Sequence, residues 1–149
     1  MSEHTKKGER LRFRMSLSDR STHRLVTVDV ALLNRAWKLT GEHYIGLNGH
    51  GATIGRLKRF KSWLRENPNE TIEAPVVYLT DERNWVWFHD GRHRFAVLRD
   101  LGYREIKVAV FREQAAQFRE HFASQVGGLS KRRKPGRVSR TPKKNRSSG

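Results

Sequence analysis

Residues 84–101 read N-W-V-W-F-H-D-G-R-H-R-F-A-V-L-R-D-L, and their pattern changes halfway along. Aromatic and β-branched side chains alternate over residues 85–88, which predicts a strand. After residue 92 the apolar side chains recur every three or four positions, which predicts a helix. Residues 89–91 join the two as a tight turn. The backbone N–H groups that begin a helix lack intrahelical partners and attract anions, so this stretch predicts an anion site.

The first turn of the predicted helix carries three basic side chains, Arg92, His93 and Arg94. Cations at a helix N-terminus oppose the helix dipole by about 0.3–1 kcal/mol each, and a purely structural cap would carry acidic residues instead. We therefore predict a phosphate site formed by Gly91 and the three basic residues. The alternative is structural: Asp90 is the helix N-cap, Gly91 eases the turn, and the basic side chains are solvated.

The composition describes a basic chain with its charge concentrated at the ends. The 149 residues suffice for one domain, but a hydrophobic content of 36% indicates that part of the chain does not pack. The net charge is +16, of which residues 1–24 carry +4, residues 25–126 carry +3 and residues 127–149 carry +9. This distribution predicts a basic N-terminal arm, a folded domain at 25–126 and a basic tail.

Several classes of protein are excluded or disfavoured. The chain has no cysteine, which excludes disulfides, zinc-thiolate sites and a thiol nucleophile. No apolar run approaches the length of a membrane span, and residues 1–9 lack the apolar centre of a signal peptide. We therefore expect a cytoplasmic protein that does not use a membrane.

The tail, residues 127–149, is rich in Lys, Arg, Ser, Pro and Gly, and we expect it to be disordered in isolation. Such a segment binds nucleic acid by neutralising phosphates, so DNA is the expected partner. The tail residues predicted to contact DNA are Lys131, Arg132, Arg133, Lys134, Arg137, Arg140, Lys143 and Lys144.

Five glycines fall within residues 41–55, just before a predicted helix. Glycine lets backbone amides approach a ligand closely, so Gly49 and Gly51 are candidate phosphate contacts; the alternative is that they only form turns. The sequence is not a Walker A loop, because no Gly-Lys-Ser/Thr follows.

Residues 54–66 predict a basic amphipathic helix, with Ile54, Leu57, Phe60 (or Lys61) and Leu64 facing inward. Its outward residues Arg56 and Arg59 are candidate contacts to a DNA backbone, or simply a solvated face. The remaining predicted elements are strands at 25–30, 74–80 and 105–111, helices at 31–38 and 113–125, and an edge strand within 11–17.

This order of elements, with D-G-R-H-R at 90–94 and L-G-Y at 101–103, resembles the ParB/sulfiredoxin superfamily over residues 25–111. The resemblance implies an α+β fold, a small mixed sheet with helices, here followed by the disordered basic tail. In that superfamily the turn binds nucleotide phosphates, a role that the resemblance carries to Gly91, His93 and Arg94.

The chain also departs from the better-known branches. Arg92 stands where sulfiredoxins have cysteine, which excludes thiol-dependent sulfinate reduction. Arg92 and His93 replace the Glu and Arg of the ParB motif, and no helix-turn-helix domain follows. Residues 44–56 and 85–94 are instead similar to small plasmid fertility-inhibition factors of the oncogenic-suppression type. That similarity implies nucleotide hydrolysis and DNA cleavage that blocks conjugal transfer.

We therefore interpret the chain as a nucleotide-using DNase. Arg94 would stabilise charge, His93 would act as acid or base, and Asp90 would hold a metal ion or orient water. ATP or another nucleotide, with Mg²⁺, is the expected cofactor, and the metal ligands are otherwise unknown. Two alternatives stay open: a non-catalytic module that binds DNA or nucleotide, and an inhibitor that contacts conjugation or type IV secretion components.

Overall fold

The computed structural model describes residues 11–80 and 85–123, which form an α+β fold, as the sequence predicts; a small two-stranded sheet accompanies the predicted mixed sheet. The strands are β1 (Phe13–Arg14), β2 (His23–Asp29), β3 (Ile72–Glu73), β4 (Val76–Leu79), β5 (Val86–Asp90) and β6 (Glu105–Phe111). The α-helices are α2 (Val30–Thr40), α3 (Arg56–Glu66), α4 (Arg92–Asp100) and α5 (Ala115–Phe122). Short 3₁₀ turns lie at Leu17–Asp19, Leu47–Gly49 and Arg112–Gln114.

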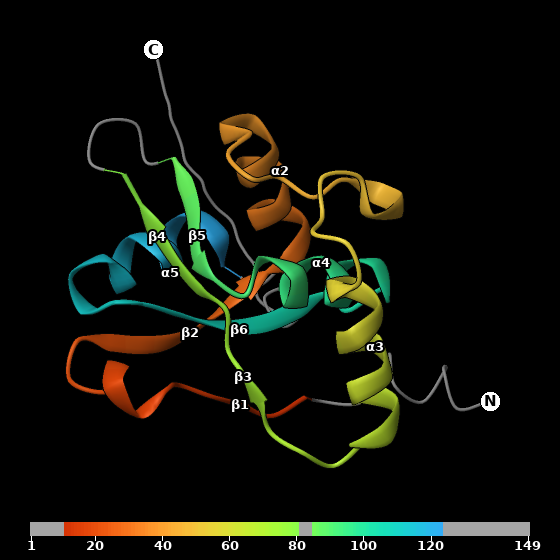
Figure 1. Ribbon diagram of the computed structural model, residues 1–149. Coiled ribbons are helices and arrows are strands. Elements are labelled where there is room, and N and C mark those ends of the chain that lie inside the picture. The colour runs from red at the N-terminus through yellow and green to blue at the C-terminus, as the bar shows by residue number, and fades with distance from the viewer. Residues whose placement is uncertain (1–10, 81–84, 124–149) are drawn as a thin grey trace.

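The larger sheet has the strand order β2-β6-β4-β5 (Figure 1). Strand β6 pairs antiparallel with β2 and parallel with β4, and β4 and β5 form an antiparallel pair. Helix α4 is the connection that carries the chain from β5 at the edge to β6 inside the sheet. Strands β1 and β3 form a separate parallel pair, so the segment predicted as an N-terminal arm contributes residues to both sheets.

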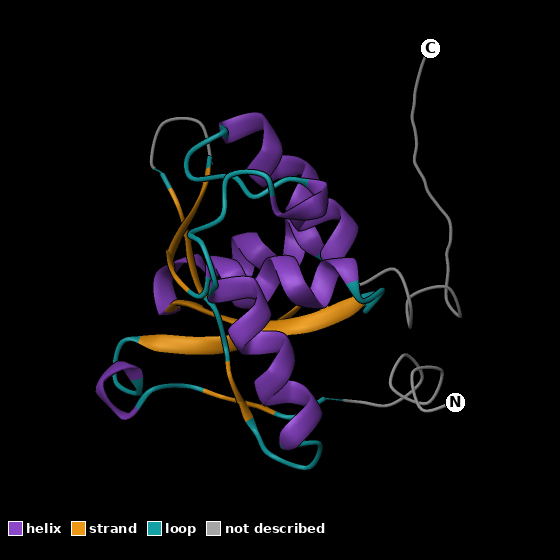
Figure 2. Cartoon of the chain, turned by 45° about the vertical axis from the view of Figure 1, so that its right-hand side comes forward, coloured by secondary structure: helices purple, strands orange, loops and turns teal. Residues whose placement is uncertain are grey.

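The main core lies between the larger sheet and the helices, which Figure 2 shows gathered largely on one side of it. Trp37 of α2 is fully buried at its centre. The centroid of its indole lies 4.8 Å from that of the Tyr44 ring, 4.5 Å from Phe88 and 5.7 Å from Phe95. This aromatic cluster ties α2, β5, α4 and the loop after α2 into one unit, which holds the strand-to-helix turn in place.

The boundaries of α2 follow from its end residues. The Asp29 carboxylate accepts a hydrogen bond of 2.9 Å from the Leu32 amide and so caps the helix N-terminus. At the other end the Gly41 amide donates to the Trp37 carbonyl over 2.9 Å and closes the last turn. Leu33 and Trp37 of this helix are both fully buried, and Leu32 is partly buried against the same core.

Other local predictions need correction. Ile54 is 96% exposed and precedes α3, so its predicted inward position is wrong, whereas Leu57, Phe60 and Leu64 pack against the core as predicted. Strand β5 continues through Asp90, which shortens the predicted turn at 89–91 to a single residue. The predicted helix at 113–125 is α5, which begins at Ala115 after a 3₁₀ turn and ends at Phe122.

Candidate phosphate-binding site

Strand β5 passes into helix α4 through Gly91, whose φ of 83° lies in the left-handed region. The first intrahelical bond joins the Phe95 amide to the Gly91 carbonyl over 2.9 Å, and no side chain caps the helix. The structural alternative, in which Asp90 is the N-cap, is therefore wrong: Asp90 belongs to β5, and its carboxylate lies 3.6 Å from the Arg94 guanidinium. The first turn of α4 thus presents uncapped amides.

A cavity of about 350 Å³ opens at this turn. Most of its lining comes from the end of β5 and the start of α4, with further residues from the loop after α2 and from α3. The lining residues are His43, Arg56, Phe88, His89, Asp90, Gly91, Arg92, His93 and Arg94. Three guanidinium groups therefore share the cavity walls with one carboxylate, which gives the cavity a positive character.

Arg92 fastens the glycine-rich loop to the turn. Its guanidinium donates hydrogen bonds to the His43 carbonyl at 2.9 Å and to the Gly51 carbonyl at 3.3 Å, and its other terminal nitrogen lies 3.5 Å from the Thr53 hydroxyl. Burial and the nearby positive charge of Arg56 both lower the pKa of Arg92. These carbonyl contacts satisfy donors without neutralising the charge, so Arg92 stays a cation in the cavity wall.

His93 has a different role from the one that its position in the motif predicts. Its side chain is buried, and its Nε2 accepts a 3.0 Å hydrogen bond from the Thr53 amide. A ring nitrogen that accepts a hydrogen bond carries no proton, so the imidazole is neutral. Burial, together with the charges of Arg92 and Arg56, lowers the pKa of His93 to about 4. The expectation that three cations meet here is therefore wrong for His93, and its Nε2 is occupied.

Arg94 is held beneath the turn. Its Nε donates to the Glu73 carbonyl of β3 at 3.0 Å, and one terminal nitrogen faces Asp90 at 3.6 Å. That nitrogen is buried and makes no hydrogen bond. A Cβ atom at residue 91 would lie 2.7 Å from it, so the glycine is what allows the guanidinium to lie this close to the backbone.

The two glycines predicted to touch phosphate have packing roles instead, and neither lines the cavity. Gly51 has a φ of 96°, and a Cβ atom there would lie 2.5 Å from the Tyr44 carbonyl oxygen. At Gly49 an added Cβ would lie 2.8 Å from the Leu57 side chain. Both let the loop fold tightly enough to present its carbonyl groups to Arg92.

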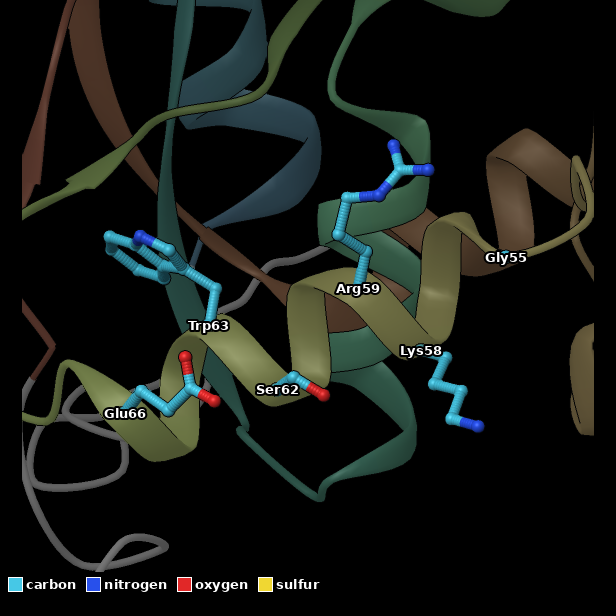
Figure 3. Close-up of a pocket in the computed structure, with 6 residues that line it drawn as sticks. All are labelled: Gly55, Lys58, Arg59, Ser62, Trp63 and Glu66. Carbon is cyan, nitrogen blue, oxygen red and sulfur yellow. The ribbon is translucent and has the colours of Figure 1, made fainter.

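Arg56 is a cavity residue that sequence reasoning placed elsewhere. It was predicted to track a DNA backbone, and the structure brings it from the first turn of α3 into the cavity wall. Within residues 11–80 and 85–123 its guanidinium makes no hydrogen bond or ion pair. Arg59, predicted for the same role, lines a separate groove on α3, which Figure 3 shows. His43 and His89 also line the cavity, and sequence reasoning did not select either as a ligand contact.

The predicted DNA contacts of the tail, at positions 131–144, lie outside the described residues, as does the predicted hairpin turn at 81–84. In the described part of the chain, no three His, Asp or Glu side chains are grouped so that they could hold one metal ion. Among those same residues, no helix has both the length and the apolar character needed to cross a bilayer.

This geometry defines a small α+β protein with a cationic cavity at a strand-to-helix turn. Its sequence matches no protein family and no curated protein. Its fold is similar to that of an oncogenic suppression activity protein, a plasmid fertility inhibition factor whose crystal structure was solved as a gold(I) cyanide derivative. The TM-score is 0.53 at 18% sequence identity, over 68% of this chain and 57% of that one. The chain thus spans little more than half of the similar protein, and the likeness shows the fold. The wider relation to ParB and sulfiredoxin stays a prediction.

The packing of the glycine-rich loop predicts a contrast between two glycines of positive φ. Gly41→Ala should lower the free energy of unfolding by about 1 kcal/mol, because it strains the backbone but meets no atom within 4 Å. Gly51→Ala should cost about 2 kcal/mol or more, because it adds the clash with Tyr44 to the same strain. Urea unfolding of both variants measures the difference; equal losses would show that the loop is not packed as described.

The neutral state of His93 predicts that it contributes to a loss of stability in mild acid. Its pKa in the folded protein, about 4, lies below the ordinary 6.5, so the folded state favours the deprotonated ring. The stability that comes from the neutral ring is complete above pH 6.5 and is lost as the pH falls toward 4. By pH 4.5 the loss amounts to about 2–3 kcal/mol. In His93→Gln, whose amide oxygen still accepts from Thr53, the loss between pH 7 and 4.5 should be smaller by about that amount. Urea unfolding at both pH values tests this, and parallel pH profiles would place a protonated imidazole in the folded protein.

Proposed function

We propose that the protein binds phosphate groups of nucleotides or DNA in the cavity at the start of α4. One observation supports this most strongly: the Arg56 guanidinium, which has no partner among the described residues, shares a small cavity with Arg92 beside the uncapped amides of a helix. Two nearby cations raise each other's energy: burial lowers the pKa of Arg92, and the charge of Arg56 lowers it further. A dianionic guest removes that cost and accepts hydrogen bonds from both the guanidinium and the amides.

The shape and chemistry of the cavity favour a phosphate ester over a simple carboxylate. Guanidinium groups bind phosphate through two parallel hydrogen bonds, and a phosphate has enough oxygens to engage two such groups together. A volume of about 350 Å³ also exceeds what the phosphate alone fills. The rings of Phe88, His43 and His89 line the remaining wall, where they can contact the sugar or base of a nucleotide.

In the cell, we propose that this binding serves plasmid fertility inhibition, the restriction of conjugal DNA transfer. The support is the fold shared with a plasmid fertility inhibition factor. A protein that captures nucleotide or DNA phosphate could act on the transferred strand or on the nucleotide-driven transfer apparatus, and the cavity chemistry is the same for both.

Substitution of Arg56 is the most direct test of the site. The side chains of Arg92 and Arg94 also donate hydrogen bonds to backbone carbonyls of the fold, whereas the Arg56 side chain makes no such contact in the described residues. Arg56→Gln should weaken binding of ATP and of a short single-stranded oligonucleotide by about 10- to 100-fold, the loss of one charge-assisted contact. Fluorescence anisotropy at fixed salt measures both affinities.

Arg119→Gln is the matched control, since it removes the same charge from an exposed position on α5. It should leave ATP binding unchanged. Equal effects of the two variants would mean that the overall positive charge, and not the cavity, binds these ligands.

Cleavage of the bound phosphoester is a second candidate function, favoured by one observation. The Asp90 side chain is 55% exposed and lines the cavity beside His89, so a carboxylate lies next to the proposed phosphate position. It could hold Mg²⁺ or orient the attacking water. The Nε2 atom of His93 already accepts a hydrogen bond from the Thr53 amide. We therefore do not assign His93 the acid–base role that its position in the motif predicts.

If cleavage occurs, Asp90→Asn should abolish product formation from plasmid DNA or ATP, while Arg56-dependent binding persists. The assay is incubation of the purified protein with each substrate, with and without Mg²⁺, against the variant. Unchanged turnover in Asp90→Asn would remove this carboxylate from the reaction. Binding without product in the unmodified protein would leave phosphate binding as the function.

A further inference from the structure

A second hollow lies on the surface of α3, next to the phosphate cavity. It is a groove of about 460 Å³ lined by Gly55, Lys58, Arg59, Ser62, Trp63 and Glu66 (Figure 3). Nothing in the proposed phosphate site uses these residues. The groove lies along one helix and is formed by side chains one turn apart, so its chemistry is that of a narrow surface strip.

Trp63 forms the apolar wall of this groove. Its ring is stacked on that of Phe60, with centroids 5.9 Å apart and an angle of 10° between the planes. Phe60 itself packs against the core, as do Leu57 and Leu64, so it holds the tryptophan from behind. Trp63 is half-buried, which leaves part of a large, supported aromatic surface facing the groove.

The polar part of the groove is mainly cationic. In Figure 3 the side chains of Arg59 and Trp63 extend from the same side of α3, as expected for residues four apart, while Lys58 lies on the other side. In the described part of the chain the side chains of Lys58 and Arg59 make no hydrogen bond and no ion pair. The one acidic residue, Glu66, lies at the far end of the helix from the cavity.

The groove and the cavity adjoin at the N-terminus of α3. Gly55 lines the groove and Arg56, the next residue, lines the cavity, and α3 packs directly on α4. From Arg56 to Trp63 the helix rises about 10 Å. Arg56 and Arg59, three residues apart on the helix, therefore lead from the phosphate cavity toward the aromatic platform of Trp63.

We propose that this groove is a base-binding subsite for single-stranded polynucleotide, in which Trp63 stacks on a base while a backbone phosphate of the same strand occupies the cavity. The inference rests on the proposed phosphate binding and identifies the class of ligand. A supported aromatic ring beside cations fits a strand whose bases are accessible, whereas the bases of a duplex are already stacked. An acidic peptide offers charge but no π-face that could stack on Trp63.

The test compares two octamers with the same phosphates, oligothymidylate and an abasic strand, by fluorescence anisotropy with the full chain at fixed salt. Trp63→Leu should weaken binding of the thymidylate about 5- to 100-fold, the range for loss of one stacked base, and leave the abasic octamer unchanged. Trp63→Phe should restore part of the affinity. Trp85→Leu, at an exposed tryptophan on the segment before β5, is the matched control and should change neither. Thermal melting of each variant confirms that it is folded.

Three results would overturn the inference. Equal effects of Trp63→Leu on the two octamers, including no effect on either, would mean that no base stacks there. If Trp63→Leu weakens the binding of a poly-glutamate of matched charge as much as that of oligothymidylate, the groove is a site for acidic peptides. If the unmodified protein binds the abasic octamer as tightly as thymidylate, the phosphate site stands without a base subsite, whereas failure to bind ATP and both octamers would overturn the proposed function itself.

Discussion

The site depends on one backbone constraint, the left-handed conformation of Gly91. There the chain leaves the edge strand β5 and begins α4 without an intervening loop. A Cβ atom at this position would lie 2.8 Å from the Pro75 Cα and 2.7 Å from the Arg94 guanidinium, so any other residue would force apart the link between β3 and β4. Because the turn is so short, the helix begins uncapped, directly beside the carboxylate of Asp90 and the aromatic end of β5.

Sequence reasoning located the elements well where a period was clear. Strand β6 runs over residues 105–111 as the alternation predicts, and the strand-turn-helix centred on Gly91 is present, although β5 ends two residues later than predicted. It failed on side-chain partners that lie about 40 residues away. The Thr53 amide pairs with His93, and the His43 carbonyl pairs with Arg92; neither contact leaves a mark in the local pattern, because each depends on how the loop packs.

The same long-range packing redistributes the positive charge. A motif of three adjacent basic residues suggests three equivalent cations, yet the helix turns each side chain in a different direction. His93 points into the protein and is neutral, and Arg94 is held against β3, while Arg56 from another helix takes the open position in the cavity. The sequence predicts that Arg56 lies on the exposed face of a helix. That it lines this cavity becomes clear only from the packing of α3 on α4.

The fold positions the backbone turn, whereas individual side chains supply the charge of the cavity. Structural similarity therefore carries information about the first and not about the second. At 18% identity the shared fold with a fertility inhibition factor fixes the position of the turn, since strand order and helix placement define it. It does not fix the chemistry, because the Arg56 cation of the cavity comes from α3, an element whose exposed residues the fold does not constrain. The position of the turn therefore follows from the fold, whereas the charge that α3 adds to the cavity depends on one side chain, Arg56. Under the proposed function, the phosphate would thus be held jointly by the turn and by the first residue of α3, and selectivity for the rest of the ligand would come from the side chains around them.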